Sequence, residues 1–202
     1  LAGEGYGMAQ GRALSRQSAM ESFVLLKNDG VLPLGPAHKK IAVIGWHGGS
    51  ARALFGGYTA MAMKESSLGV TLSMAGIQVD PDAPAAAGGD QATYPGSAVR
   101  QEDPRVEALV HRCYPGVQTL WQALAAACPD AEVRYAAGYP YAGNDENGFA
   151  EALGLARWAD VVVCTLGGHY GWNLACTTGE GLDSQNIGLP ACQEAFLRAL
   201  AP

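Results

Sequence analysis

The sequence predicts an α/β fold: a parallel-type sheet flanked by helices, forming a partial α/β sandwich. Two apolar runs, at residues 40–45 and 160–166, are typical of strands buried on both faces, and each is closed by a glycine. Residues 131–137, which Gly138 follows, predict a third strand. Helical patterns alternate with these runs, which indicates parallel strands joined by right-handed crossovers.

Three helices are expected between and after these strands. Apolar residues recur every three or four positions over residues 117–128 and 149–156, which is the periodicity of an amphipathic helix. The third helix is expected to begin at Pro190, because proline suits the first turn of a helix. Cys192 and Phe196 then lie on one face of it.

The chain divides into a leading segment and one domain. Residues 1–35 predict a linker helix and a short extended piece, and residues 36–202 the N-terminal part of the sandwich domain. Within this domain, residues 77–112 are rich in proline and small residues and hold few apolar anchors. We interpret them as a long loop or insertion that carries a function or faces a partner.

Composition excludes several classes of function. The chain has 202 residues and a formal net charge of −6, and its Lys and Arg residues are scattered, so a nucleic-acid partner is not expected. No window approaches the roughly 20 apolar residues of a membrane span. The five cysteines are widely spaced without a C-x-x-C pair. They predict reduced, mostly buried thiols, and we expect neither a metal site nor a cofactor.

The loops after Gly45, Gly138 and Gly167 should meet at one edge of the sheet, where ligands bind in such folds. Residues 45–50 follow a strand as a phosphate loop would, but they lack its lysine and match no dinucleotide fingerprint. A tight turn with positive φ at glycine is the simpler interpretation. Nucleophilic hydrolysis is disfavoured, because no G-x-S-x-G elbow follows a strand.

The loop at residues 167–183 is the best candidate for a site. It carries aromatic side chains, a histidine and two carboxylates, which suits a sugar ligand. Gly179 and Gly181 leave Glu180 without bulky neighbours, so a substrate can approach it. On these residues alone, Glu180 is equally well a solvated loop carboxylate.

Several motifs, in order along nearly the whole chain, resemble the C-terminal α/β-sandwich domain of glycoside hydrolase family 3. They begin with AMESFVLLKNDGVLPL at residues 19–34 and continue with IAVIG at 41–45, GGY at 56–58, VRYAAG at 133–138, ADVVV at 159–163, GEGLD at 179–183 and LPACQ at 189–193. One departure is Ser184, where many members carry arginine, and the segment 77–112 is longer than the common form.

The resemblance implies part of a retaining exo-β-glycosidase of the β-glucosidase kind. In this family a TIM barrel carries the nucleophilic aspartate and the sandwich domain lends the acid/base glutamate, which matches Glu180. Trp172, His169 and Asp183 are secondary candidates for contacts on the aglycone side. Loop packing for Trp172, an ordinary surface position for His169 and a bracing role for Asp183 remain alternatives. Lys27 and Asn28 are interpreted as structural.

The resemblance also implies partners. No segment matches the barrel nucleophile loop, and the family pattern continues past the last helix, so we expect a fragment of a larger enzyme that is inactive alone. Its partners are then a β-linked oligosaccharide or glycoside and the missing barrel domain, with a homo-oligomer possible through the sheet edge. A non-catalytic sugar-binding or assembly module is the alternative, and glucoside or xyloside preference is left open.

Overall fold

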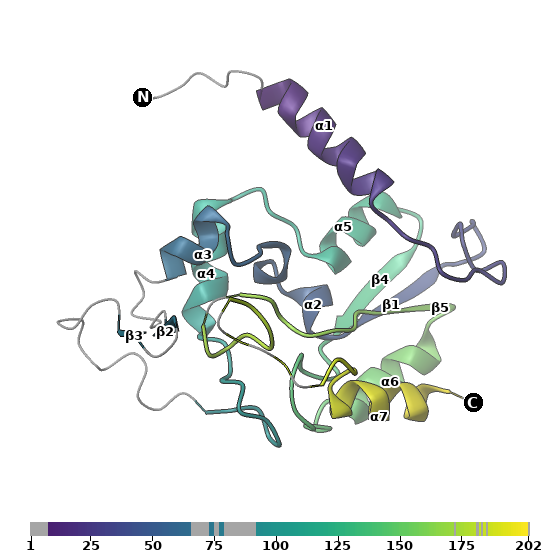
Figure 1. The fold of residues 1–202 in the computed structure, drawn as a ribbon. Helices are drawn as coiled ribbons and strands as arrows, with labels where there is room; N and C mark the ends of the chain where they lie inside the picture. The colour runs from purple at the N-terminus through teal and green to yellow at the C-terminus, as the bar shows by residue number, and fades with distance from the viewer. Residues whose placement is uncertain are drawn as a thin grey trace. The chain divides into compact units, whose positions relative to one another are not determined.

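The computed structural model describes residues 8–65, 73–74, 77–78, 92–171, 173–180, 182, 184 and 186–201. These residues form two units, one within residues 1–37 and one within residues 38–202 (Figure 1). Because the position of one unit relative to the other is not determined, each is described by itself.

The first unit consists of helix α1 (Met8–Glu21) and an extended segment with a tight turn. Asn28 builds this turn with its side chain. Its Oδ1 accepts hydrogen bonds from the backbone N–H groups of Gly30 and Leu32, both at 3.1 Å, and its Nδ2 donates to the carbonyl of Leu32 at 2.7 Å. Asparagine favours such turns because its amide can replace backbone partners. The geometry supports the structural interpretation of Asn28.

The second unit is built on a parallel sheet of β1 (Lys40–Ile44), β4 (Glu132–Ala136) and β5 (Val161–Cys164). The strand order is β4-β1-β5, so the first strand in the chain lies at the centre. Ile41 is in register with Val133 on one side and with Val161 on the other. The predicted α/β fold with a parallel sheet is confirmed.

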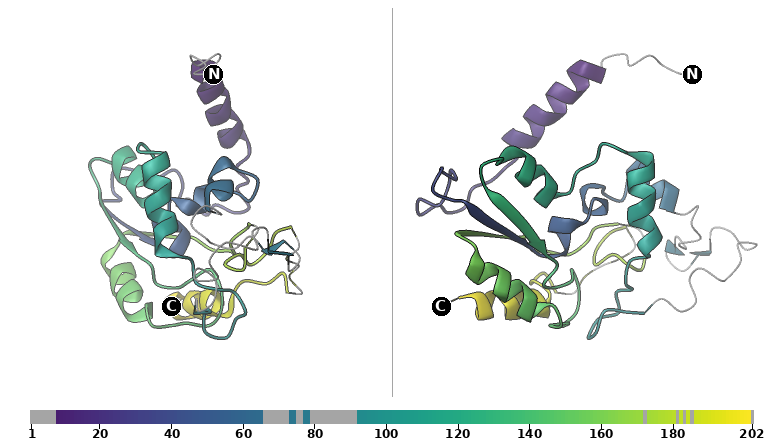
Figure 2. Two further views of the ribbon diagram at one scale, coloured as in Figure 1. Left: turned by 90° about the vertical axis from the view of Figure 1, so that its left-hand side faces the viewer. Right: turned by 180° about the vertical axis from the view of Figure 1, so that it is seen from behind.

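Helices cover both faces of this sheet. Helices α6 (Phe149–Trp158) and α7 (Ala191–Leu200) lie on one face, and α5 (Leu120–Ala127) and the short α2 (Trp46–Gly49) on the other (Figures 1 and 2). Side chains of β1 alternate between the two faces. Ala42 and Ile44 pack with Phe196 of α7 in a buried cluster, while Val43 lies on the side of α2.

A second apolar cluster lies outside the sheet. It is formed by the 3₁₀ turn η1 (Arg52–Leu54), α3 (Ala60–Glu65) and α4 (Pro104–Cys113), with Met61, Leu109 and Val110 at its centre. Two short strands, β2 (Ser73–Met74) and β3 (Ile77–Gln78), pair antiparallel beyond it.

The interpretation of residues 77–112 as a long loop is wrong at its C-terminal end, where α4 forms. The Asp103 side chain caps this helix by accepting from the backbone N–H of Arg105 at 2.8 Å, and Pro104 occupies the first turn. Asp-Pro at a helix start is a recognisable signal. In residues 77–112 the other prolines make this helix-start signal hard to distinguish in the sequence. Residues 79–91 lie outside the described part of the chain.

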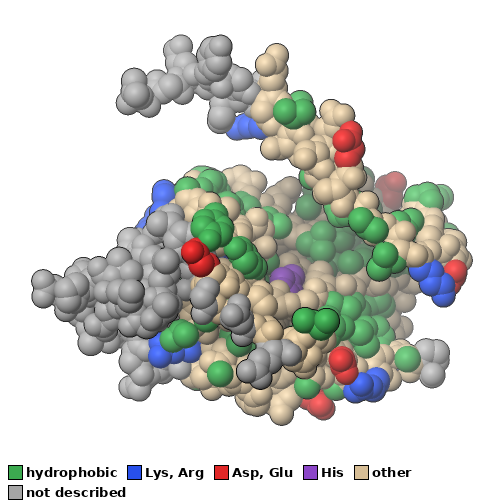
Figure 3. All heavy atoms as spheres, viewed as in Figure 1, with side chains coloured by type: hydrophobic (Ala, Val, Ile, Leu, Met, Phe, Trp, Pro, Cys, Tyr) green, Lys and Arg blue, Asp and Glu red, His purple; other side chains and the backbone are tan. Residues whose placement is uncertain are grey.

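Few described side chains on the face in Figure 3 are charged. On the face in Figure 3, the described acidic and basic side chains lie in small separate groups between hydrophobic and neutral areas. All five cysteines are free thiols; Cys176 and Cys192 are buried, and the other three are partly buried. Among the residues that the structure describes, no helix has the length and apolarity needed to cross a membrane. Within the same residues, no cluster of His, Cys, Asp or Glu has a metal-binding arrangement.

Candidate active site

The loops after β1 and β5 come together because these strands are neighbours and parallel. Gly45 turns the chain sharply at the end of β1, with φ at 113°. A Cβ atom there would lie 2.4 Å from the carbonyl oxygen of Thr165, so only glycine fits. This geometry supports the tight-turn interpretation of residues 45–50 over a phosphate loop.

The loop after β5 is anchored at its root by a side chain from α7. Gln193 is fully buried. Its amide oxygen accepts from the N–H of Gly167 at 2.8 Å, and its amide nitrogen donates to the carbonyl oxygens of Gly167 at 2.9 Å and Pro140 at 3.2 Å. The ring Nε2 of His47 adds a bond to the carbonyl of Gly168 at 2.8 Å. The loop therefore leaves the sheet in one fixed direction.

The two arms of this loop brace each other. The Thr177 hydroxyl accepts from the N–H of His169 at 2.8 Å and donates to the carbonyl of the same residue at 3.0 Å. The N–H of Gly171 donates to the carbonyl of Thr178 at 3.0 Å. These bonds satisfy backbone groups that a loop leaves unpaired, and they lead the chain to the turn that carries Glu180.

Glu180 lies at the tip of a tight turn. The backbone groups of Gly179 and Leu182 exchange two hydrogen bonds, each of 3.1 Å, across the tip. A Cβ atom on Gly179 would lie 1.6 Å from the carbonyl oxygen of Gly171, so glycine is required for the arms to close. The Glu180 side chain is exposed. Its carboxylate is thus held outward, within reach of a ligand.

Tyr58, from the loop after β1, contacts Glu180 directly. Its phenolic hydroxyl donates a hydrogen bond to Oε2 of Glu180, although the Tyr58 ring is 67% exposed. The bond to this carboxylate raises the pKa of the Tyr58 phenol above its ordinary value, with lesser contributions from burial and from charge. Tyr170 is also partly exposed and packs against Gly56. We call Tyr58, Tyr170 and Glu180 the tyrosine rim.

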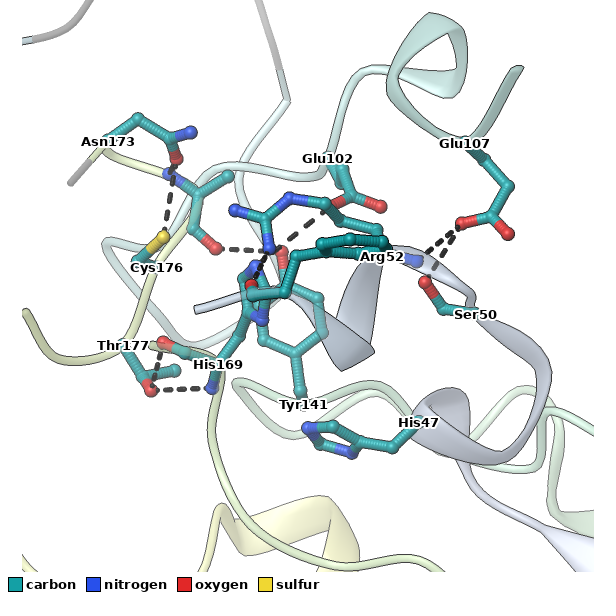
Figure 4. Close-up of polar contacts among 12 residues, drawn as sticks. His47, Ser50, Arg52, Glu102, Glu107, Tyr141, His169, Asn173, Cys176 and Thr177 are labelled. Atoms are coloured by element: carbon teal, nitrogen blue, oxygen red, sulfur yellow. Dashed lines mark hydrogen bonds and ion pairs between the residues drawn. The ribbon is translucent and has the colours of Figure 1, made fainter. Parts of the chain in front are cut away.

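His169 occupies an interior position, only 5% exposed. Its ring packs against Trp46 and Tyr141, each with a centroid distance of 5.2 Å, and its Nε2 is 4.0 Å from a carboxylate oxygen of Glu102 (Figure 4). Burial, reinforced by the guanidinium of Arg52, lowers the pKa of His169 to about 3. The histidine is therefore a neutral ring that supports the loop from inside.

The other two candidates from the sequence, Trp172 and Asp183, lie outside the described residues. Sequence reasoning missed the contact of Tyr58 with Glu180, although it singled out the motif that contains this tyrosine. The available signal was its position: a Gly-Gly-Tyr sequence in the loop after the central strand, next to the strand that leads to Glu180.

A cavity of about 770 Å³ opens beside the loop of Glu180. Its described lining includes Tyr170 and Thr177 from this loop and Ser97 and Asn144 from neighbouring loops. It also includes Ser184, where many members of the family carry arginine. Apolar residues such as Ile187 and Leu189 supply most of the lining, a few hydroxyl and amide side chains supply polar groups, and no described lining residue is charged. A mostly apolar lining with a few polar groups is typical of a site for an uncharged small molecule.

The fold and this edge define an α/β domain that presents an exposed carboxylate on a braced loop. Comparison with known families identifies it further: the model of the glycosyl hydrolase family 3 C-terminal domain matches residues 23–202. The chain belongs to this family, as its motifs predict.

Individual relatives agree with this assignment. The chain is 48% identical to a β-glucosidase of Rhizobium radiobacter over 63 residues, which are 31% of the chain and 8% of that protein. Its fold is similar to that of a family 3 exo-β-xylosidase solved with a xylobiose aziridine activity-based probe, with a TM-score of 0.55 and 23% identity. This match covers 95% of the chain but 17% of the xylosidase. The chain thus spans a small part of either relative.

Proposed function

We propose that this chain is the part of a retaining exo-β-glycosidase that supplies the general acid/base, Glu180, to an active site completed by a barrel domain. The observation that carries the proposal is the exposed Glu180 carboxylate at the tip of a braced turn. Membership of the family and the activities of the two relatives, a β-glucosidase and an exo-β-xylosidase, support it. The substrate is a β-linked glycoside or oligosaccharide.

The proposed reaction proceeds in two steps. In the first, a carboxylate of the barrel attacks the anomeric carbon while Glu180 donates its proton to the departing oxygen. In the second, Glu180 removes a proton from water, which attacks the same carbon and releases the nucleophile. Retention of configuration requires the two carboxyl groups to lie about 5–5.5 Å apart. A carboxylate at the end of an anchored loop is suited to that approach.

The same arrangement explains how one residue serves both steps. A negative nucleophile close to Glu180 repels a second negative charge, which suits Glu180 to act as the acid in the first step. Once the glycosyl group is attached, that neighbouring charge is gone, and Glu180 can act as the base in the second step.

Trp172 and Asp183 are proposed as contacts on the aglycone side, because they belong to the same loop as Glu180. For His169 the geometry favours a supporting role, since its ring is buried between Trp46 and Tyr141. A ligand that meets this loop from solvent would reach the tyrosine rim first.

The test is Glu180→Gln in the enzyme that combines this domain with its barrel, assayed with aryl β-glucosides and β-xylosides of graded leaving-group acidity. Loss of a general acid should lower kcat/KM by about 10²- to 10⁴-fold for poor leaving groups and far less for good ones. The control is Glu151→Gln, an exposed glutamate of α6, which should leave every rate unchanged. Unaltered kinetics of Glu180→Gln with retained sugar binding would instead support a non-catalytic sugar-binding module.

A further inference from the structure

We propose that Tyr58 is a positioning residue for Glu180: its hydroxyl holds one carboxyl oxygen and thereby directs the other toward the substrate. The inference rests on the proposed function of Glu180. It starts from the hydrogen bond between the Tyr58 hydroxyl and Oε2 of Glu180, which joins residues 122 positions apart in the sequence.

The backbone of Tyr58 is anchored, although its ring is exposed. Next to it, the Thr59 hydroxyl donates to the carbonyl of Gly56 at 2.7 Å and accepts from the N–H of Ala62 at 3.4 Å, which fixes the start of α3. Met61 and Ala62 of that helix are buried in the domain. Tyr58 therefore projects from a rigid base.

Glu180 has weaker support of its own. Its turn is closed by the two backbone hydrogen bonds between Gly179 and Leu182, and its side chain is exposed. A long exposed side chain samples many rotamers unless a contact selects one. The bond from Tyr58 makes that selection, from the loop of the neighbouring strand β1.

The contact also assigns different tasks to the two carboxyl oxygens. One oxygen accepts the hydrogen bond from the Tyr58 hydroxyl in both steps of the reaction. The other carries the proton that goes to the leaving group, and later takes the proton from water. Because a phenol that donates to a carboxylate favours the ionised form, Tyr58 assists the base step most. It also keeps the acid proton on the substrate side in the first step.

The described titratable groups at this contact are Tyr58 from the β1 loop and Tyr170 from the loop of Glu180, as the raised pKa of Tyr58 reflects. Loss of the Tyr58 hydroxyl removes the bond that orients the Glu180 carboxylate, so the base step of the reaction should slow most.

The experiment uses Tyr58→Phe in the enzyme with its barrel, and an aryl β-glycoside with a good leaving group, for which deglycosylation limits turnover. We expect kcat and KM to fall together by about 10-fold while kcat/KM stays near its wild-type value, because only the base step slows. The control, Tyr114→Phe, removes a hydroxyl from a ring that packs on Phe55 of the same loop. It should keep the wild-type kcat and KM.

A second measurement separates positioning from an independent role. In a Glu180→Ala background, Tyr58→Phe should have no further effect, because its partner is gone. An equal loss in both backgrounds would overturn the proposal, since Tyr58 would then act on the substrate itself. A wild-type kcat of Tyr58→Phe would also overturn the proposal, provided that Glu180→Gln still lost acid catalysis. If Glu180→Gln were unaffected, the proposed function itself would fail.

Discussion

Buried polar residues define the interior side of the candidate site. Arg52 is almost completely buried; its backbone N–H donates to Glu107 at 3.2 Å and its guanidinium donates to the carbonyl of Phe55. The Tyr141 hydroxyl donates to the carbonyl of Ala175 at 2.7 Å. Buried polar groups need such partners, because an unmade bond in the interior costs about 1–3 kcal/mol. These residues therefore stabilise the loop from below the surface that Glu180 presents.

His169 makes this stability depend on pH. Its pKa is near 3 in the fold, against about 6.5 in an unfolded chain. Between about pH 3 and pH 6.5, the unfolded state therefore binds a proton at His169 that the folded state does not bind. The contribution of the neutral ring is thus complete above about pH 6.5 and is lost as the pH falls toward 3, by at most about 1.4 kcal/mol per unit.

We expect His169→Gln to flatten the loss of stability between pH 6.5 and about 4, although it lowers stability at neutral pH. Urea unfolding at several pH values measures both effects. If the free energy of unfolding depended on pH in His169→Gln as it does in the wild type, the ring would be protonated in the folded state over this pH range.

At the scale of elements, the regular core was predictable and the additions to it were not. The apolar runs of β1 and β5, the short strand segment of β4 and the periodic apolar stripes of α5, α6 and α7 are visible in the sequence, and all six elements form where expected. Helices α2 and α3 lie in a glycine-rich stretch and are short, so neither shows a full period. They form because tertiary contacts, such as the burial of Met61, stabilise them.

The link between α7 and the loop of Glu180 gives a prediction at this scale. Gln193→Leu keeps the approximate size of the side chain but leaves the N–H and carbonyl of Gly167 without their buried partner. We expect the free energy of unfolding to fall by about 2–4 kcal/mol. Activity should fall as well, because the start of the loop loses its anchor. The neighbouring Glu194→Gln, at a residue paired with Arg198 on the surface, should change stability by less than about 0.5 kcal/mol in urea unfolding.

For the whole molecule, the strand order determines which loops meet. Because β1 lies between β4 and β5, the loop with Tyr58 adjoins the loop with Glu180, as the expectation of one shared edge implied. The loop that carries Glu180 could be predicted from the sequence, because the motif and the flanking glycines are next to it in the chain. The burial of His169 and the bond from Tyr58 depend on side chains far apart in the chain, which no local pattern encodes.

Under the proposed function, Glu180 acts on a substrate that is bound with the help of another domain. The chain spans 17% of the xylosidase and 8% of the β-glucosidase that it resembles, so the test belongs in the complete enzyme. Glu180→Ala should still form the glycosyl-enzyme from a substrate with a good leaving group, but hydrolysis of that intermediate should stall for lack of a base.

The most direct measurement is therefore azide rescue of Glu180→Ala with an activated aryl β-glycoside. Azide needs no general base, so the account predicts that it restores turnover and yields a glycosyl azide of β configuration. Turnover of the variant at the wild-type rate without azide, on activated and unactivated substrates alike, would contradict the assignment of Glu180.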